Sequence, residues 1–207
     1  MTGRFITLEG GEGVGKSTQL QALAEALRAR GLTVVTTREP GGSAGAEAIR
    51  ALLMTGSEDR WSARAEALLF AAARADHVEK LIRPALARGD WVLCDRFIDS
   101  TRAYQGGAGG LSDDDILALH GVGSEGLMPD RTLVLTLPTS IALSREQARD
   151  GHKVDRFGVR DMVFKIGVEA NFRRIAMQNP ERLKIVNVVG SVEEVTNQLF
   201  AELADFL

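Results

Sequence analysis

Apolar and polar positions along the chain follow two alternating patterns. Short runs that are almost continuously apolar and rich in β-branched residues predict strands, whereas stretches with an apolar residue every three or four positions predict helices. We expect strands at residues 4–9, 32–39, 91–95, 132–137 and 183–189. We expect helices at residues 16–30, 46–54, 63–88, 113–119, 140–149, 162–177 and 192–206.

The spacing within these stretches supports this interpretation. Leu20, Leu23 and Leu27 share one face of the first predicted helix, and Gly31 follows where a glycine commonly ends a helix. Pro84 predicts a kink or break in the long helix at 63–88. Continuously apolar strands separated by helices are typical of a parallel sheet covered on both faces. The pattern therefore predicts an α/β fold with a five-stranded parallel sheet.

Composition narrows the class of protein. The 207 residues fit one domain, with or without a small lid, and the net charge of −3 argues against nucleic acid as the main partner. The N-terminal segment lacks a signal-peptide pattern, and the apolar stretch at 67–73 is too short to span a bilayer. A single cysteine, Cys94, allows no disulfide within the chain and fits a reducing compartment. We expect a cytoplasmic protein with no membrane partner.

The segment "GGEGVGKS" carries the most specific chemistry. Gly10, Gly15, Lys16 and Ser17 match G-x-x-x-x-G-K-[ST] between a predicted strand and a predicted helix. Such a loop surrounds phosphates with backbone N–H groups, the lysine reaches the β- and γ-phosphates, and the serine holds Mg²⁺. The motif indicates a nucleoside triphosphate but leaves open a GTPase switch, a motor-type ATPase or a small-molecule kinase. The chain is small for a motor and lacks the Asn-Lys-x-Asp segment expected of a GTPase.

Polar residues follow two other predicted strands. Ligands in an open parallel sheet lie beyond the carboxyl ends of the strands, so Arg38 and Glu39 of "TREPGG" and Asp95 and Arg96 of "DRF" belong to the active side. Asp95 is suited to hold Mg²⁺ beside Ser17, and Arg96 to bind phosphate oxygens in a fork. Taken alone, each motif is also compatible with a turn that carries a surface ion pair.

Three further segments offer candidate contacts. Phe70 and Arg74 share a helix face and suit stacking on a base and bonding its edge, although a core phenylalanine beside a surface arginine fits the same spacing. The loop "DSTRAYQGG" at 99–107 offers hydroxyls, a phenol and an amide, which suit either base and sugar recognition or helix capping. The charged stretch "RDGHKVDRFGVR" is a candidate lid; five cations lie in or just before it: Arg145, Arg149, Lys153, Arg156 and Arg160. Cys94, His77, His120 and His152 show no metal-ligand spacing and are interpreted as structural or exposed.

Taken together, these motifs resemble the thymidylate kinase family, in particular its bacterial branch. The resemblance covers nearly the whole chain through "LEGGEGVGKST", "TREPGG", "LLFAAARADH", "DRFIDSTRAYQGG", the Pro-Asp pair at 129–130 and "DRF" at 155–157. It implies a P-loop nucleoside monophosphate kinase fold, as one domain over residues 1–207 with a lid at about 145–160. It also implies transfer of the ATP γ-phosphate to dTMP with Mg²⁺, by a homodimer.

The resemblance implies a role for each matching residue. ATP would be bound by Gly10, Gly11, Glu12, Gly13, Val14, Gly15, Lys16, Ser17 and Thr18. The dTMP site would comprise Arg38, Glu39, Arg50, Phe70, Arg74, Arg96, Ser100, Thr101, Tyr104 and Gln105, with Arg38, Arg50 and Arg96 on the phosphate. Phe70 would stack on thymine, and Tyr104 would lie under the deoxyribose. Catalysis would involve Lys16, Arg96, Glu12 and the lid residue Arg149, and the metal would be held by Ser17 and Asp95.

Four positions depart from the family pattern: Thr136, Gln147, Gly158 and Asn187. Gln147 and Gly158 lie in the candidate lid and bear on rate, whereas Thr136 and Asn187 bear on local hydrogen bonds. Two alternatives therefore remain: another nucleoside monophosphate kinase, or a catalytically weak nucleotide-binding relative.

Overall fold

The structure is a computed structural model that describes residues 3–138, 141 and 161–207. A single parallel sheet forms its centre, with the strand order β2-β3-β1-β4-β5. The strands are β1 (Phe5–Glu9), β2 (Val34–Arg38), β3 (Trp91–Asp95), β4 (Arg131–Thr136) and β5 (Leu183–Asn187). This result confirms the five-stranded parallel sheet and each of the five predicted strand positions.

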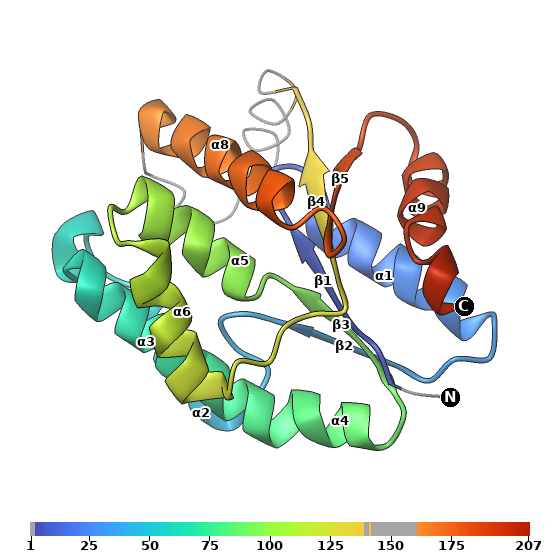
Figure 1. The fold of residues 1–207 in the computed structure, drawn as a ribbon, viewed down its shortest axis with the longest axis horizontal. Helices are drawn as coiled ribbons and strands as arrows, with labels where there is room; N and C mark the ends of the chain where they lie inside the picture. The colour runs from blue at the N-terminus through green and yellow to red at the C-terminus, as the bar shows by residue number, and fades with distance from the viewer. Residues whose placement is uncertain (1–2, 139–140, 142–160) are drawn as a thin grey trace.

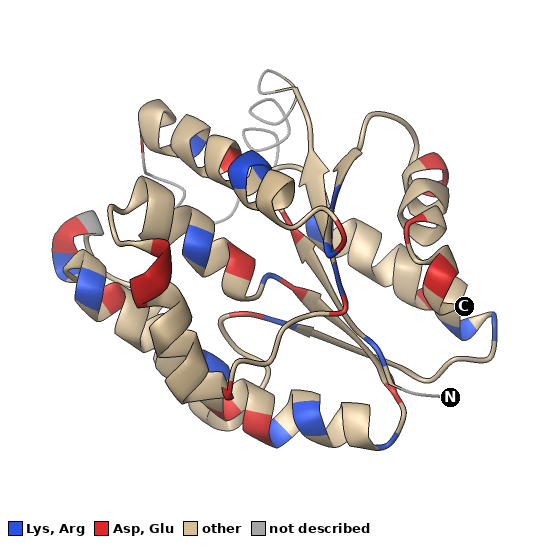
Figure 2. Cartoon of the chain, viewed as in Figure 1, with Lys and Arg blue, Asp and Glu red and all other residues tan. Residues whose placement is uncertain are grey.

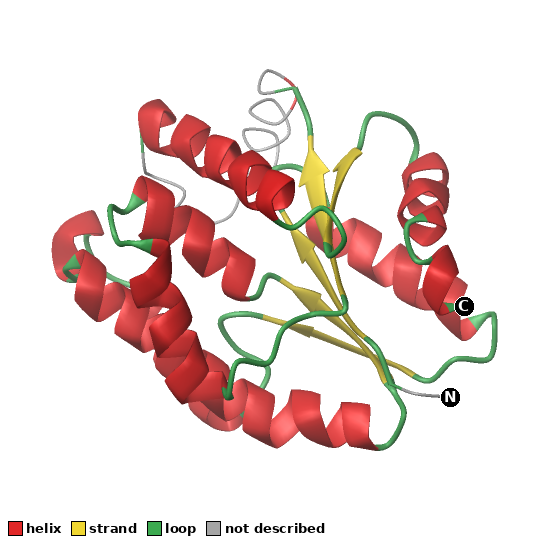
Figure 3. Ribbon diagram, viewed as in Figure 1, coloured by secondary structure: helices red, strands yellow, loops and turns green. Residues whose placement is uncertain are grey.

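Helices cover both faces of the sheet (Figures 1 and 3). One face carries α1 (Lys16–Arg28) and α9 (Val192–Ala201), whose leucines pack on Ile6, Leu8 and Leu93 of the sheet. The opposite side carries α2 (Ala44–Met54), α3 (Ala63–His77), α4 (Arg83–Ala87), α5 (Ile98–Thr101), α6 (Asp113–Ser124) and α8 (Met162–Gln178). Two further apolar clusters, one around Phe5 and Phe97 and one around Phe172, fill the space beneath these helices.

Most helix starts are set by a side-chain cap. Ser43, Ser62 and Ser112 each accept a hydrogen bond from a backbone N–H in the first turn of α2, α3 and α6. Asp161 does the same for α8, and Ser191 forms a full capping box with Glu194 at α9. In contrast, α1 starts at Gly15 without a side-chain cap, so its first N–H groups point into the loop before it.

Two segments differ from the sequence-based expectation. The stretch 63–88 is not one α-helix: α3 is followed by a π-helical turn (Val78–Ile82) and then α4, with Pro84 in the first turn of α4. The stretch 99–107 is not a loop, because α5 continues into a π-helical turn (Arg102–Ala108). Buried contacts of Asp99 and Ser100, described below, stabilise this helical path. The predicted helix at 140–149 lies outside the described residues.

The remaining elements are 3₁₀ turns at Glu58–Arg60 and Ala204–Phe206. In the view of Figure 2, acidic and basic residues are interspersed along the helices. Within the described part of the chain, no helix is both long and apolar enough to cross a membrane.

Candidate active site

The loop between β1 and α1 has the shape of a phosphate cradle. Gly10, Gly13 and Gly15 adopt φ values of 129°, 72° and 88°, which side chains rarely allow. A Cβ atom on Gly10 would collide with the carbonyl oxygen of Leu135, so only glycine fits there. At Gly11 and Gly15, a Cβ atom would meet nothing within 4 Å in the described part of the chain, and the loop is open on that side. Together with the uncapped start of α1, this geometry suits an anion.

Lys16 lies folded against this loop. Its Nζ donates a 2.6 Å hydrogen bond to the Gly11 carbonyl, and the residue is buried. Burial lowers the pKa of Lys16 to about 8, and the nearby positive charge of Arg96 acts in the same direction. A phosphate in the cradle would supply the negative charge that favours the protonated amine.

Ser17 and Asp95 meet across the gap between β1 and β3. The Ser17 hydroxyl donates a 2.8 Å hydrogen bond to Asp95 Oδ2. The other oxygen, Oδ1, is buried and has no hydrogen-bond partner among the described residues. Mg²⁺ commonly binds one or two protein oxygens and completes its coordination shell with phosphate oxygens and water. The Ser17 hydroxyl and the Asp95 carboxylate can supply such protein oxygens. The two residues therefore fit the predicted magnesium site.

Arg96 lies between the phosphate loop and α5. Its Nη1 donates to the Gly10 carbonyl at 3.0 Å and to the Ser100 hydroxyl at 3.1 Å. The guanidinium lies 5.1 Å from the centroid of the Tyr104 ring. Its backbone has φ 69°, a left-handed conformation that is uncommon for a residue with a side chain. The fork of N–H donors on the guanidinium suits a phosphate group beside the loop.

Glu9 contacts the residues that follow Arg96, and the sequence analysis did not identify it as a site residue. The residue is fully buried at the end of β1, where it accepts hydrogen bonds from the backbone of Phe97 and from Ser100. Burial raises the pKa of Glu9 to about 8, with the charge of Asp99 adding to the effect. The signal was present in the sequence, because an acid ending an apolar strand is the same pattern that identified Asp95.

A buried cluster joins β2, α3 and α5 on the acceptor side. Arg74 donates to Glu39 at 2.8 Å and to the Thr101 hydroxyl at 2.9 Å, and its guanidinium lies 5.1 Å from the Phe97 ring centroid. His77 bridges Glu39 and Thr37 at 3.0 and 2.8 Å. The structure thus brings together Glu39, Arg74 and Thr101, three of the residues predicted for the dTMP site. It also shows that His77 is fully buried and structural.

The other predicted acceptor residues occupy different positions. Phe70 is half-buried on α3, one turn before Arg74. Gln105 is buried and donates a 2.8 Å hydrogen bond to the buried carboxylate of Glu66, a partner that the sequence analysis missed. Arg38 is exposed and pairs with Glu47 at 3.0 Å, and Arg50 donates to the Pro40 carbonyl at 2.7 Å. Their contacts with dTMP stay predictions.

A cavity adjoins the loop on the side of α8. It is lined by Gly10, Gly11 and Glu12, by Tyr104, and by α8 residues that include Phe164 and Phe172. The Tyr104 ring meets both phenylalanine rings edge-on at centroid distances of 6.1 and 6.4 Å. Glu12 and Tyr104 therefore face one space beside the cradle. Arg149 and the other cations of the candidate lid lie outside the described residues, as do Gln147 and Gly158.

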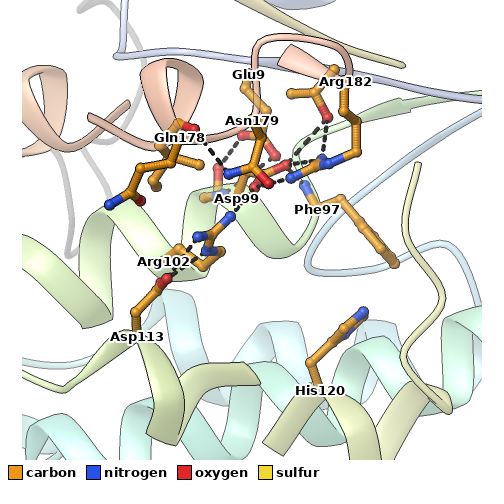
Figure 4. A network of polar contacts seen from close by, with 12 residues as sticks. Glu9, Phe97, Asp99, Arg102, Asp113, His120, Gln178, Asn179 and Arg182 are labelled. Carbon is orange, nitrogen blue, oxygen red and sulfur yellow. Dashed lines mark hydrogen bonds and ion pairs between the residues drawn. The ribbon is translucent and has the colours of Figure 1, made fainter. Parts of the chain in front are cut away.

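Behind the site, an ionic network fixes α5 to the sheet (Figure 4). Asp99 is fully buried and accepts from Arg182 at 2.6 and 2.9 Å and from Arg102 at 3.1 Å. Arg102 also binds Asp113 through two bonds of 2.6 and 2.8 Å. Although burial opposes ionisation, the bonds and charges of the two arginines hold the pKa of Asp99 below its usual value. The network explains why the segment after β3 is helical.

Comparison with known proteins agrees with this geometry. A sequence model described as thymidylate kinase matches residues 8–199. A thymidylate kinase of Rhizorhabdus wittichii RW1 is 62% identical over 207 residues, covering 100% of both chains. One from Rhodopseudomonas palustris TIE-1 is 51% identical over 97% of this chain and 88% of its own. The crystal structure of thymidylate kinase from Ehrlichia chaffeensis, 32% identical, covers 98% of this chain and 100% of its own with a TM-score of 0.80.

The match in sequence extends over the whole length, and the match in structure includes the sheet and the helices around it. The predicted P-loop nucleoside monophosphate kinase fold is confirmed, as is the predicted resemblance. The chain belongs to the thymidylate kinase family.

Proposed function

We propose that the protein transfers the γ-phosphate of ATP to dTMP, giving ADP and dTDP. The observation that carries the proposal is the meeting of Lys16 and Ser17 with Asp95 and Arg96 at the carboxyl ends of adjacent strands. Donor and acceptor phosphates can therefore be held side by side. Membership of the thymidylate kinase family supports dTMP as the acceptor.

On the donor side, loop amides and Lys16 bind the triphosphate. The Nζ of Lys16, now on the Gly11 carbonyl, moves to the β- and γ-phosphate oxygens when these arrive. Ser17 and Asp95 would hold Mg²⁺, which when bound neutralises charge on the phosphate oxygens. Glu12, beside the cradle, positions the acceptor nucleotide.

On the acceptor side, Arg96 binds the dTMP phosphate, with Arg38 and Arg50 at its outer edge. The second pKa of a phosphate monoester is about 6, so an acceptor oxygen is already ionised at neutral pH and no general base is needed. That oxygen forms a bond to the γ-phosphorus while the bond to the β–γ bridging oxygen breaks, and the electron pair leaves with ADP. Arg96 and Lys16 reduce the repulsion between the two anions and hold them in line.

Base and sugar selection come from α3 and from the helical segment after β3. Phe70 stacks on thymine, Arg74 and Gln105 bind its polar edge with Ser100 and Thr101 nearby, and Tyr104 excludes a 2′-hydroxyl. The cluster around Arg74 supports this role, because Glu39 and Thr101 hold the guanidinium in one orientation. We further propose a homodimer, with twice the 22.3 kDa mass of one chain in sedimentation equilibrium.

A substrate panel tests the proposal. Turnover with ATP and Mg²⁺ is measured for dTMP, dUMP, UMP, AMP and dGMP at equal concentration, and dTMP is expected to give the highest kcat/KM. Preference for UMP, AMP or dGMP would show a different nucleoside monophosphate kinase. Tight dTMP binding in calorimetry without formation of ADP would instead show a nucleotide-binding relative with little catalysis.

A further inference from the structure

The side chain of Glu9 ties the end of β1 to the turn that follows β3 (Figure 4). Its Oε1 accepts from the backbone N–H groups of Phe97 at 2.8 Å and Ser100 at 3.3 Å. Its Oε2 lies 2.5 Å from the Ser100 hydroxyl. A buried carboxyl group is costly without hydrogen bonds, and these three contacts satisfy it. They also fix the segment 97–100 to the residue that directly precedes the phosphate loop.

The backbone of Arg96 depends on these contacts. A residue with a side chain at φ 69° is held in a sparsely populated conformation, which persists only where the surroundings impose it. The Arg96 N–H donates to the Leu8 carbonyl at 3.0 Å, and the next N–H, of Phe97, donates to Glu9. Hydrogen bonds to the last two residues of β1 therefore clamp the left-handed residue on both sides.

The side chain of Arg96 is connected to Glu9 as well. The Ser100 hydroxyl accepts from Arg96 Nη1 at 3.1 Å and lies against Glu9 on its other side. The second acceptor of that guanidinium nitrogen is the Gly10 carbonyl, one residue after Glu9. The Ser100 hydroxyl thus connects the Glu9 carboxyl to the guanidinium, so a shift of the carboxyl would also shift the guanidinium.

We propose that Glu9 is a positioning residue for phosphoryl transfer, which sets Arg96 against the phosphate loop through the 97–100 turn and the Ser100 hydroxyl. Glu9 acts as a hydrogen-bond acceptor rather than as a charge. Burial raises the pKa of Glu9 and so favours the protonated acid, and Oε1 can accept hydrogen bonds in that state too. The inference rests on the proposed function, because it assigns Arg96 to the acceptor phosphate.

Three substitutions at Glu9 separate acceptor capacity from packing. Glu9→Gln keeps the length, an acceptor oxygen for the two N–H groups and a polar atom for Ser100. Glu9→Asp keeps the acid but withdraws it by about 1.5 Å, one carbon–carbon bond. Glu9→Met keeps the length and removes both oxygens. The control is Asp205→Asn, a carboxylate paired with Arg131 at the opposite, amino end of the strands.

The first measurement needs no substrate. The ¹⁵N NMR signal of the Arg96 guanidinium, assigned by its loss in Arg96→Lys, is compared between folded variants. We expect the wild-type signal in Glu9→Gln and Asp205→Asn, and a shifted or broadened signal in Glu9→Asp and Glu9→Met. If Glu9→Met does not fold, Glu9→Asp provides the test, because it keeps the carboxyl group and changes only its reach. An unchanged Arg96 signal in folded Glu9→Asp would overturn the proposal.

The second measurement is kinetic. In Glu9→Asp and Glu9→Met, kcat/KM for dTMP is expected to fall about tenfold, as for the loss of one or two neutral hydrogen bonds, while KM for ATP stays within about twofold. Glu9→Gln is expected to keep kcat/KM for dTMP and KM for ATP near their wild-type values. A role that depends on a negative charge at Glu9 would not allow this. If the apparent affinity for ATP fell as much as kcat/KM for dTMP, the result would contradict the proposal that Glu9 acts through Arg96 on the acceptor phosphate.

A coupling test identifies Ser100 as the intermediate. Ser100→Ala alone should lower kcat/KM for dTMP, and adding it to Glu9→Met should cost little more, because both remove one connected chain of contacts. Additive losses would count against that chain. If wild-type protein forms no dTDP although the Arg96 signal responds to Glu9, the proposed function fails while the positioning role stands.

Discussion

Glu9 shows how a single buried group can be both a cost to the fold and a part of the site. Burial raises its pKa from 4.5 to about 8, so folding favours the protonated acid over the carboxylate. The carboxyl group nevertheless accepts hydrogen bonds from both Phe97 and Ser100. Lys16 is a second example, because burial disfavours its charge, which a phosphate in the cradle would favour.

The raised pKa of Glu9 predicts how stability depends on pH. Between about pH 4.5 and pH 8, the folded state keeps a proton at Glu9 that the unfolded state has released. The stability from this group is therefore complete below that range and is lost as pH rises through it, by at most about 1.4 kcal/mol per pH unit. Urea unfolding across this range should show Glu9→Gln gaining stability relative to wild type. Parallel pH curves for the two proteins would contradict the raised pKa, and Asp205→Asn should keep the wild-type slope.

At the scale of elements, two ion pairs with very different surroundings link the end of β2 to helices α3 and α2. Arg74 and Glu39 are each only 3% exposed in their side chains, whereas Arg38 and Glu47 are 54% and 42% exposed. Both pairs link the end of β2 or the residue after it to a helix. The buried pair, with His77 and Thr101, connects α3 and α5 to the end of β2.

This difference predicts unequal costs for two matched substitutions. Glu39→Gln leaves the buried charge of Arg74 without its partner and should lower the free energy of unfolding by about 3 kcal/mol or more. Glu47→Gln removes an exposed pair and should cost about 1 kcal/mol or less. Urea unfolding with equal m-values provides the comparison. Equal losses in the two variants would show that the buried cluster does not hold α3 and α5 in place.

The elements also show what the sequence could and could not reveal. Strands and most helices were predictable, because apolar periodicity and capping residues are local signals. The helical path of 98–108 was not, because it depends on partners far along the chain: Glu9 for Ser100, and Arg182 for Asp99. Likewise, the residue types at strand ends indicated Asp95 and Glu39, but the partners of Arg74 and Gln105 appear only once α3 is packed against the sheet.

At the scale of the whole molecule, the strand order brings the site together. In the order β2-β3-β1, the segments after three neighbouring strands, "GGEGVGKS", "DRF" and "TREPGG", lie along one edge of the sheet. The register pairs Leu8 and Arg38 with Asp95, one on each side, so the strand that leads into the phosphate loop and the strand that ends in Arg38 flank the same aspartate. In the proposed function, two nucleotides would meet over β3, each held mainly by a different part of the chain.

This division predicts separable effects of the two ligands on thermal stability. A ligand at 100 times its Kd stabilises the folded state by about 2.7 kcal/mol, which for a chain of this size is a rise in Tm of about 5–10 °C. Lys16→Met should lose most of the rise caused by ATP and keep that caused by dTMP. Phe70→Leu should do the reverse, since it removes the stacking ring and leaves the cradle intact. Each variant is the control for the other in differential scanning fluorimetry with single ligands. If Lys16→Met abolished both rises, the donor and acceptor halves would not be independent, and the neighbouring strand ends would form one site that a single nucleotide organises.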